Sequence, residues 1–79
     1  MIVHVTAEHI AAGLRNSCRF CPIALALGPG SWVGKWCAHD KLTQYNLSDT
    51  ATAFVVAFDS GFAVEPCTLE LEEINGPVA

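Results

Sequence analysis

The sequence contains few charged residues, and the positively charged ones are confined to its first half. Charged residues make up 15% of the 79-residue chain, compared with about 25% in an average soluble domain. Residues 1–41 hold four basic and two acidic residues, a net charge of +2, whereas residues 42–79 hold six acidic and no basic residues, a net charge of −6. Because nucleic-acid binding requires a basic surface, this pattern disfavours a nucleic-acid partner. The acidic half either serves solubility or attracts a basic protein.

Long apolar segments are absent as well. No segment approaches the ~20 consecutive apolar residues that span a bilayer. The residues Met1–Thr6 lack the basic region and the long apolar stretch of a secretory signal peptide. We therefore expect a cytoplasmic protein without a membrane partner. In that compartment thiols stay reduced, so the four cysteines are expected to be buried thiols or metal ligands rather than disulfides.

Apolar residues, by contrast, are abundant. They make up 52% of the sequence, yet a domain near this size buries only about 60% of the surface of its unfolded chain. We expect one domain over residues 1–79, with more apolar side chains than its core can hold. The surplus predicts an exposed patch, which in soluble proteins tends to mark a partner or oligomer interface. Trp32 and Trp36 are the candidate partner-binding residues, because aromatic side chains anchor interfaces. The alternative places one or both of them in the core.

The periodicity of the sequence predicts a mixture of helices and strands. Thr6 and Ser48 are good helix N-caps, Gly13 with the polar residues 15–17 is expected to end the first helix, and Gly61 follows the expected end of the last. The expected elements are a strand at Ile2–Val5, a helix from Ala7 to about Leu14, a helix at Pro22–Leu27, a strand at Ser31–His39, a possible strand at Leu42–Leu47, a helix at Asp49–Ser60 and a strand at Cys67–Glu72. The tail Asn75–Ala79 is expected to fray. This order predicts an α+β domain of two layers, with two to three helices on one face of a three- to four-stranded, mainly antiparallel sheet.

The stretch Cys18–Leu27 is expected to be the central buried element. Pro22 suits the first position of a helix, where a backbone N–H would have no intrahelical partner. The residues from Pro22 to Leu27 include no polar side chain, so no face of this helix suits solvent. In the first interpretation Cys18 or Cys21 caps and packs this helix, since free cysteine is among the most often buried residue types.

Two chemical alternatives use the same cysteines. Cys18 and Cys21 form a C-x-x-C pair, and Cys37 and His39 form a C-x-H pair, so together they would supply three sulfur ligands and one nitrogen ligand to a structural zinc ion. The C-x-x-C pair would instead serve a thiol–disulfide oxidoreductase, although a helix rather than a strand precedes it and the chain is too short for a thioredoxin-like fold. No pair of carboxylates lies in an apolar context suited to acid–base catalysis, and no activated serine is found, so we predict no catalytic residue and no enzymatic activity.

Two blocks of the sequence form a recognisable pattern. The first is His9-Ile10 … Gly13 … Cys18-x-x-Cys21-Pro22-Ile23-Ala24-Leu25-Ala26-Leu27, and the second is Phe54-Val55-x-x-Phe58-Asp59-x-Gly61-x-x-Val64-x-Pro66. This pattern resembles a group of small proteins of bacteriophages of actinobacteria, to which no function is generally assigned. The resemblance carries over no catalytic or binding residue. It implies an accessory phage protein in the cytoplasm of the bacterial host, and we expect a non-enzymatic protein-interaction module that binds a host protein or associates with itself.

Overall fold

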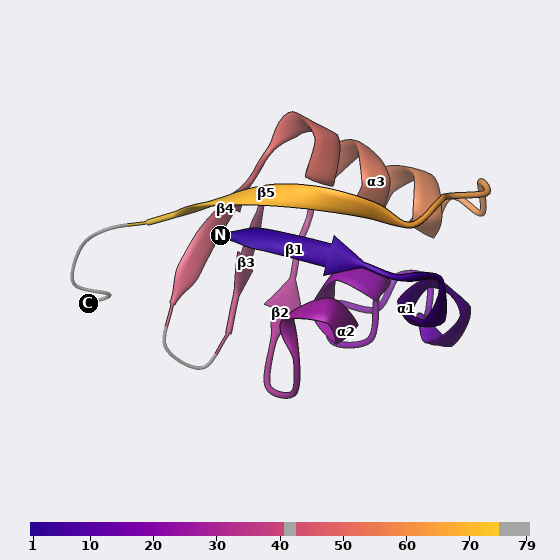
Figure 1. Ribbon diagram of the computed structural model, residues 1–79, viewed down its shortest axis with the longest axis horizontal. Helices are drawn as coiled ribbons and strands as arrows, with labels where there is room; N and C mark the ends of the chain where they lie inside the picture. The colour runs from indigo at the N-terminus through magenta and orange to yellow at the C-terminus, as the bar shows by residue number, and fades with distance from the viewer. Residues whose placement is uncertain (41–42, 75–79) are drawn as a thin grey trace.

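The computed structural model describes residues 1–40 and 43–74, which adopt an α+β architecture (Figure 1). The elements follow the order β1 (Ile2–Val5), α1 (Ala7–Ala12), α2 (Pro22–Leu27), β2 (Trp32–Val33), β3 (Cys37–His39), β4 (Gln44–Leu47), α3 (Asp49–Asp59) and β5 (Cys67–Glu73). The predicted α+β class is confirmed, but the described residues form five strands rather than three to four. The tail Asn75–Ala79, for which we predict fraying, lies outside the described residues.

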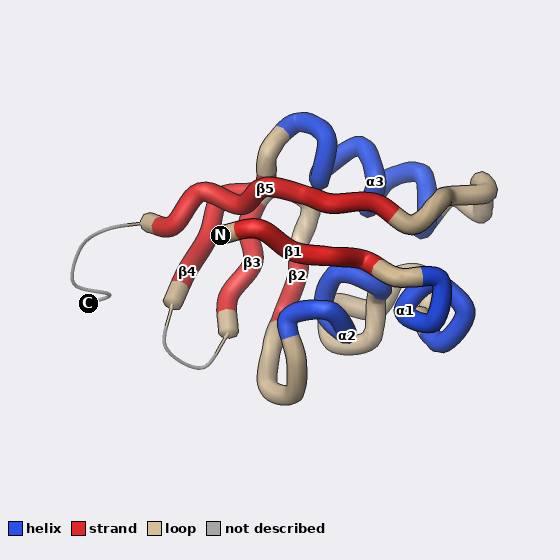
Figure 2. Tube along the Cα trace, in the orientation of Figure 1, coloured by secondary structure: helices blue, strands red, loops and turns tan. Residues whose placement is uncertain are grey.

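The strands form one sheet in the order β1-β5-β4-β3-β2, and every neighbouring pair is antiparallel. The first and last strands are neighbours, with Val3 opposite Leu69 and Val5 opposite Cys67. Figure 2 shows β1 and β5 side by side through the middle of the molecule. The helix α2 packs against both edge strands, β1 and β2, whereas α3 packs against β4 and β5. The stretch before and within α2 therefore connects the two edges of the sheet.

The core lies on one face of the sheet. The side chain of Ile23 in α2 is fully buried, with 0% exposure, and Pro22 and Ala24 beside it are also buried. The second half of α2, residues 25–27, is only half-buried, so the predicted complete burial of this helix holds for its first turn alone. The remaining core side chains come from the strands and α3: Val3, Val5, Cys21, Val33, Ala38, Tyr45, Ala51, Phe54, Val55, Phe58, Leu69 and Leu71. Because strand side chains alternate between faces, the opposite face of the sheet is left to solvent.

The segment 31–39, predicted to be one strand, forms a hairpin. Its first strand ends at Val33, its second begins at Cys37, and the N–H of Gly34 donates to the carbonyl of Cys37 at 2.8 Å. The indole of Trp32 lies over Gly34, since a Cβ at position 34 would be 2.8 Å from its Cη2 and would force the ring to shift. The chain reverses here, so the continuous alternation predicted for this segment is wrong.

The capping signals in the sequence place the helix starts correctly. The hydroxyl of Thr6 accepts the N–H of His9, and the imidazole of His9 accepts the N–H of Thr6, which closes a capping box at α1. The end of this helix was predicted too late: it stops at Ala12, and the N–H of Leu14 donates to the carbonyl of Phe20 in the loop that follows. Leu14 is consequently exposed rather than packed on a helix face.

The predictions for the second half of the chain are close to the structure. The hydroxyl of Ser48 accepts the N–H of Ala51 at 3.2 Å and caps α3, which ends one residue before the predicted Ser60. The strand predicted from Cys67 is β5 and continues one residue further. The possible strand at 42–47 is β4, and the start of that predicted range lies outside the described residues.

Candidate functional site

Cys21 has the structural role predicted for the C-x-x-C pair. It is the N-cap of α2, where its Sγ accepts the N–H of Ala24 at 3.4 Å, and its side chain is buried with 4% exposure. Burial raises the pKa of the Cys21 thiol and outweighs the backbone hydrogen bonds from Ala24 and Ile23, which lower it. Cys21 is therefore held as a neutral, capping thiol.

Cys18 does not share this burial. Its side chain is exposed, and it lines a cavity of about 200 Å³ together with Cys21, Lys35 and Asp59. The carboxylate of Asp59 accepts the N–H of Asn16 at 2.9 Å, so α3 is tied to the loop that leads into this cavity. The expectation that the cysteines are either buried or metal-bound is thus wrong for Cys18, which is a free thiol open to solvent.

The zinc alternative lacks its ligand set in this fold. Cys37 and His39 share one face of β3, as a C-x-H pair on a strand should, but both are exposed on the sheet face opposite the core. Cys21 lies in the core on the other side of the sheet. In the described part of the chain, no three His, Cys, Asp or Glu side chains are close enough to hold a metal ion. The four residues Cys18, Cys21, Cys37 and His39 are therefore not brought together.

Trp32 lies on the solvent-facing side of the sheet, and its indole is half-buried. It sits opposite His39 in the β2–β3 pair, and the two rings stack with centroids 5.6 Å apart and an interplanar angle of 13°. This stack and the close approach to Gly34 fix the indole against its own hairpin. Trp32 is neither a core residue nor a freely presented aromatic side chain.

Trp36 is presented very differently. It lies in the turn between β2 and β3, and 72% of its side chain is exposed. The backbone beneath it is anchored on both sides, because the carbonyl of Lys35 accepts the hydroxyl of Thr52 at 2.8 Å and the carbonyl of Trp36 accepts the N–H of Leu47 at 2.8 Å. An exposed indole therefore stands on a turn that is tied to both α3 and the end of β4.

The outer side of α3 adds an uncharged area beside this turn, which the sequence reading missed. Ala53 and Val56 are exposed there, Val56 at 47%, and Thr52 makes the contact to the turn. The helix has no charged residue between Asp49 and Asp59. That uncharged run is the sequence signal that could have identified the area, since a solvent-facing helix side normally carries charged residues. We call Trp36, Thr52, Ala53 and Val56 the Trp36 surface.

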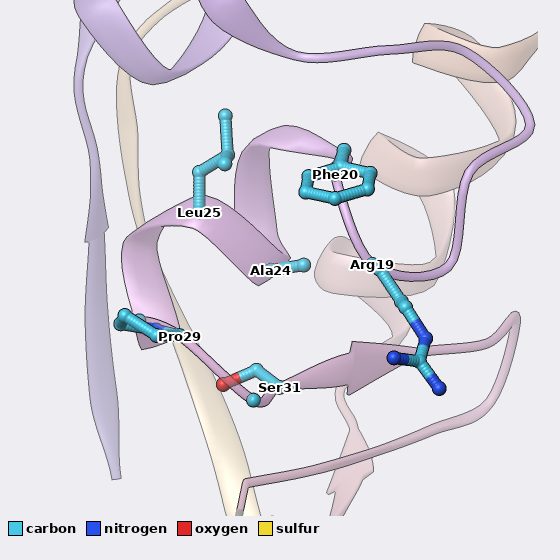
Figure 3. A pocket seen from close by; sticks show the side chains of 8 residues that line it. Arg19, Phe20, Ala24, Leu25, Pro29 and Ser31 are labelled. Carbon is cyan, nitrogen blue, oxygen red and sulfur yellow. The ribbon is translucent and has the colours of Figure 1, made fainter.

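A second hollow lies at the C-terminal end of α2. Figure 3 shows Phe20 and Arg19 on one side of it and Pro29 on the other, with the guanidinium group pointing away from the Phe20 ring. Its volume is about 400 Å³. Ser31 also lines it, but the Oγ of Ser31 is fully buried and has no hydrogen-bond partner within residues 1–40 and 43–74. The accessible wall of this hollow is therefore largely apolar.

No protein-family model, no curated protein and no solved structure matches this chain. In the described ranges, no helix has both the length and the apolar composition needed to cross a membrane. The function must consequently be inferred from the surface itself.

Proposed function

We propose that this protein is a non-enzymatic protein-interaction module that binds a bacterial host protein through the Trp36 surface. The observation that carries the proposal is the 72% exposure of the Trp36 side chain on a backbone that two long-range hydrogen bonds hold in place. Tryptophan is among the residue types that dominate binding energy at protein interfaces. The bacterial host enters through the resemblance to small actinobacteriophage proteins.

The rigidity of the turn favours binding. Ordering a loop or a rotamer-rich side chain on association costs free energy, typically about 0.5–1.5 kcal/mol for each side chain. Here the hydrogen bonds from Thr52 and Leu47 already order the backbone on both sides of Trp36. A partner would therefore meet an indole on a backbone that is already ordered.

The composition of the surrounding area also suits an interface. Charged residues are depleted at the centres of protein interfaces, because their desolvation is costly. Ala53 and Val56 lie on α3 close in sequence to Thr52, which contacts the turn, and this helix has no charged residue between Asp49 and Asp59. An uncharged helix side of this kind suits the centre of an interface.

The test combines partner capture with a matched pair of variants. The tagged chain is incubated with actinobacterial lysate, captured proteins are identified by mass spectrometry, and the dissociation constant of each purified candidate is measured. Trp36→Ala is expected to weaken binding at least about thirty-fold, the change that corresponds to ~2 kcal/mol at a hot spot. Phe62→Ala is the control, because Phe62 is 69% exposed but lies beyond the C-terminal end of α3.

Three results would contradict the proposal. The first is that no protein is captured by the wild-type chain beyond those captured by Trp36→Ala. The second is that Trp36→Ala and Phe62→Ala weaken binding equally. The third is a dimer in analytical ultracentrifugation that Trp36→Ala dissociates, because the partner at this surface would then be a second copy rather than a host protein.

A further inference from the structure

Two thiols of different exposure are held at one cavity directly before α2. Cys18 and Cys21 both line the cavity of about 200 Å³. Residues 18–20 form a turn that leads directly into Cys21, so the two cysteines stand three residues apart around a reversal of the chain. The carbonyl of Cys18 accepts the N–H of Val33 at 2.7 Å, which anchors the first thiol to β2. The two thiols therefore share one cavity, and the backbone of the first is held against β2.

The environments of the two thiols assign them different roles. Cys18 is exposed, so a dissolved reagent reaches it. Cys21 is buried and engaged with the N–H of Ala24, and burial raises its thiol pKa, so it is protected from direct attack by solutes. An accessible thiol beside a shielded one is the arrangement of an attacking and a resolving cysteine.

We propose that Cys18 is a modification site for low-molecular-weight disulfides such as glutathione disulfide, and that Cys21 resolves the adduct into a Cys18–Cys21 disulfide. In the first step Cys18 gives its proton to solvent, and its thiolate attacks one sulfur of glutathione disulfide. A mixed disulfide forms, the glutathione S–S bond breaks, and one glutathione thiolate leaves. In the second step Cys21 gives its proton to solvent and its thiolate attacks Cys18 Sγ, which releases the second glutathione thiolate. The protein loses two electrons and two protons, and glutathione disulfide is reduced to two glutathione molecules.

The disulfide alters the start of α2. In the reduced chain the Sγ of Cys21 accepts the N–H of Ala24. Bonding this sulfur to Cys18 turns it toward the cavity, so the Ala24 amide loses its cap. The helix α2 contacts both edge strands of the sheet, β1 and β2. The lost hydrogen bond is therefore in the helix that packs against both edges. We expect the hydrogen-exchange rate of the Ala24 amide to rise at least about ten-fold on oxidation, because an amide that has lost its hydrogen-bond partner is less protected from exchange.

The experiment follows the reaction of the reduced, full-length Cys37→Ser chain with glutathione disulfide by intact-mass spectrometry. Cys37 is removed because it is a second exposed thiol, on the other face of the sheet. We expect a transient glutathione adduct, followed by a product whose mass is lower than that of the reduced chain by two hydrogens. In this product Cys67 is the only remaining thiol, and peptide mapping finds Cys18 linked to Cys21. A stable adduct on Cys18, or a disulfide that includes Cys67, would overturn the proposal.

Two further variants separate the steps. With both changes made in the Cys37→Ser chain, Cys21→Ser is expected to stop at the glutathione adduct on Cys18, and Cys18→Ser is expected to remain unmodified at Cys21 at the same glutathione disulfide concentration. If Cys21→Ser does not fold, the transient adduct in the chain that retains both thiols still reports the order of the steps. The assigned roles would be contradicted if Cys21 in the Cys18→Ser variant formed a glutathione adduct as fast as the chain that retains Cys18.

Discussion

Gly13 packs directly against the ring of Pro22. A Cβ at position 13 would lie 2.8 Å from both Cγ and Cδ of Pro22 and 3.0 Å from the carbonyl oxygen of His9. The backbone of Gly13 is extended, with φ −69° and ψ 148°, so glycine is not needed there for its conformation. It is needed because the loop after α1 passes against the first residue of α2. This contact sets how closely α1 and α2 approach one another.

Gly13→Ala is expected to lower the free energy of unfolding by about 1–3 kcal/mol, the usual effect of overpacking in a tight contact. The proline ring and the carbonyl of His9 leave the new methyl group no flexible neighbour to displace. Urea denaturation measures the change. The control is the same substitution in a Pro22→Ala background, where the ring is absent. Equal effects in the two backgrounds would show that the contact with Pro22 is not the cause, because coupled neighbours give non-additive changes.

Two serine-to-alanine substitutions are expected to differ in their effect on the free energy of unfolding. Ser48→Ala removes the cap of α3 and should lower the free energy of unfolding by about 1 kcal/mol. Ser31→Ala removes a buried hydroxyl without a hydrogen-bond partner in the described residues, and should leave stability unchanged or raise it by up to about 1 kcal/mol. Thermal and urea unfolding of the two variants, measured side by side, test both expectations. A loss of stability in Ser31→Ala would mean that the hydroxyl has a partner in solution.

Stability is expected to fall as the pH rises above about 9. Burial raises the pKa of Cys21 and Cys67 above the usual 9.0, and that of Tyr45 above the usual 10.0. In each case the folded state holds the proton more tightly than the unfolded state. The contribution of each protonated group to the free energy of unfolding is therefore fully present below the pKa that the group has in the unfolded chain. This contribution is lost as the pH rises through the higher pKa that the group has in the folded chain.

Urea unfolding from pH 7 to about pH 11 measures this dependence. A Cys21→Ser/Cys67→Ser double variant should show a smaller loss between pH 8.5 and pH 10 (roughly the range in which thiols titrate), because serine does not ionise there. The same slope in the wild type and the double variant would show that the thiols do not contribute. The residual slope above pH 10 is assigned to Tyr45.

Local features of the structure could be predicted from the sequence because they depend on neighbouring residues. Thr6 and Ser48 cap helices through side chains that reach N–H groups three residues on, and Pro22 begins a helix where its missing N–H is of no consequence. The alternation in Cys67–Glu73 places Leu69 and Leu71 in the core. The capping role of Cys21 could be predicted for the same reason, because Cys21 caps the helix that directly follows it.

Tertiary structure alone decided which distant residues meet. The alternation in residues 31–39 is compatible with one strand or with a hairpin, and the pairing of Trp32 with His39 decides between them. That hairpin directs Cys37 away from Cys21, so the zinc ligand set is separated, and it places Trp36 in an exposed turn beside α3. The sequence determined the segments and their caps, which are set by contacts a few residues apart. The exposure of Cys18 and Trp36 was set by strand pairing and helix packing between segments far apart in the chain.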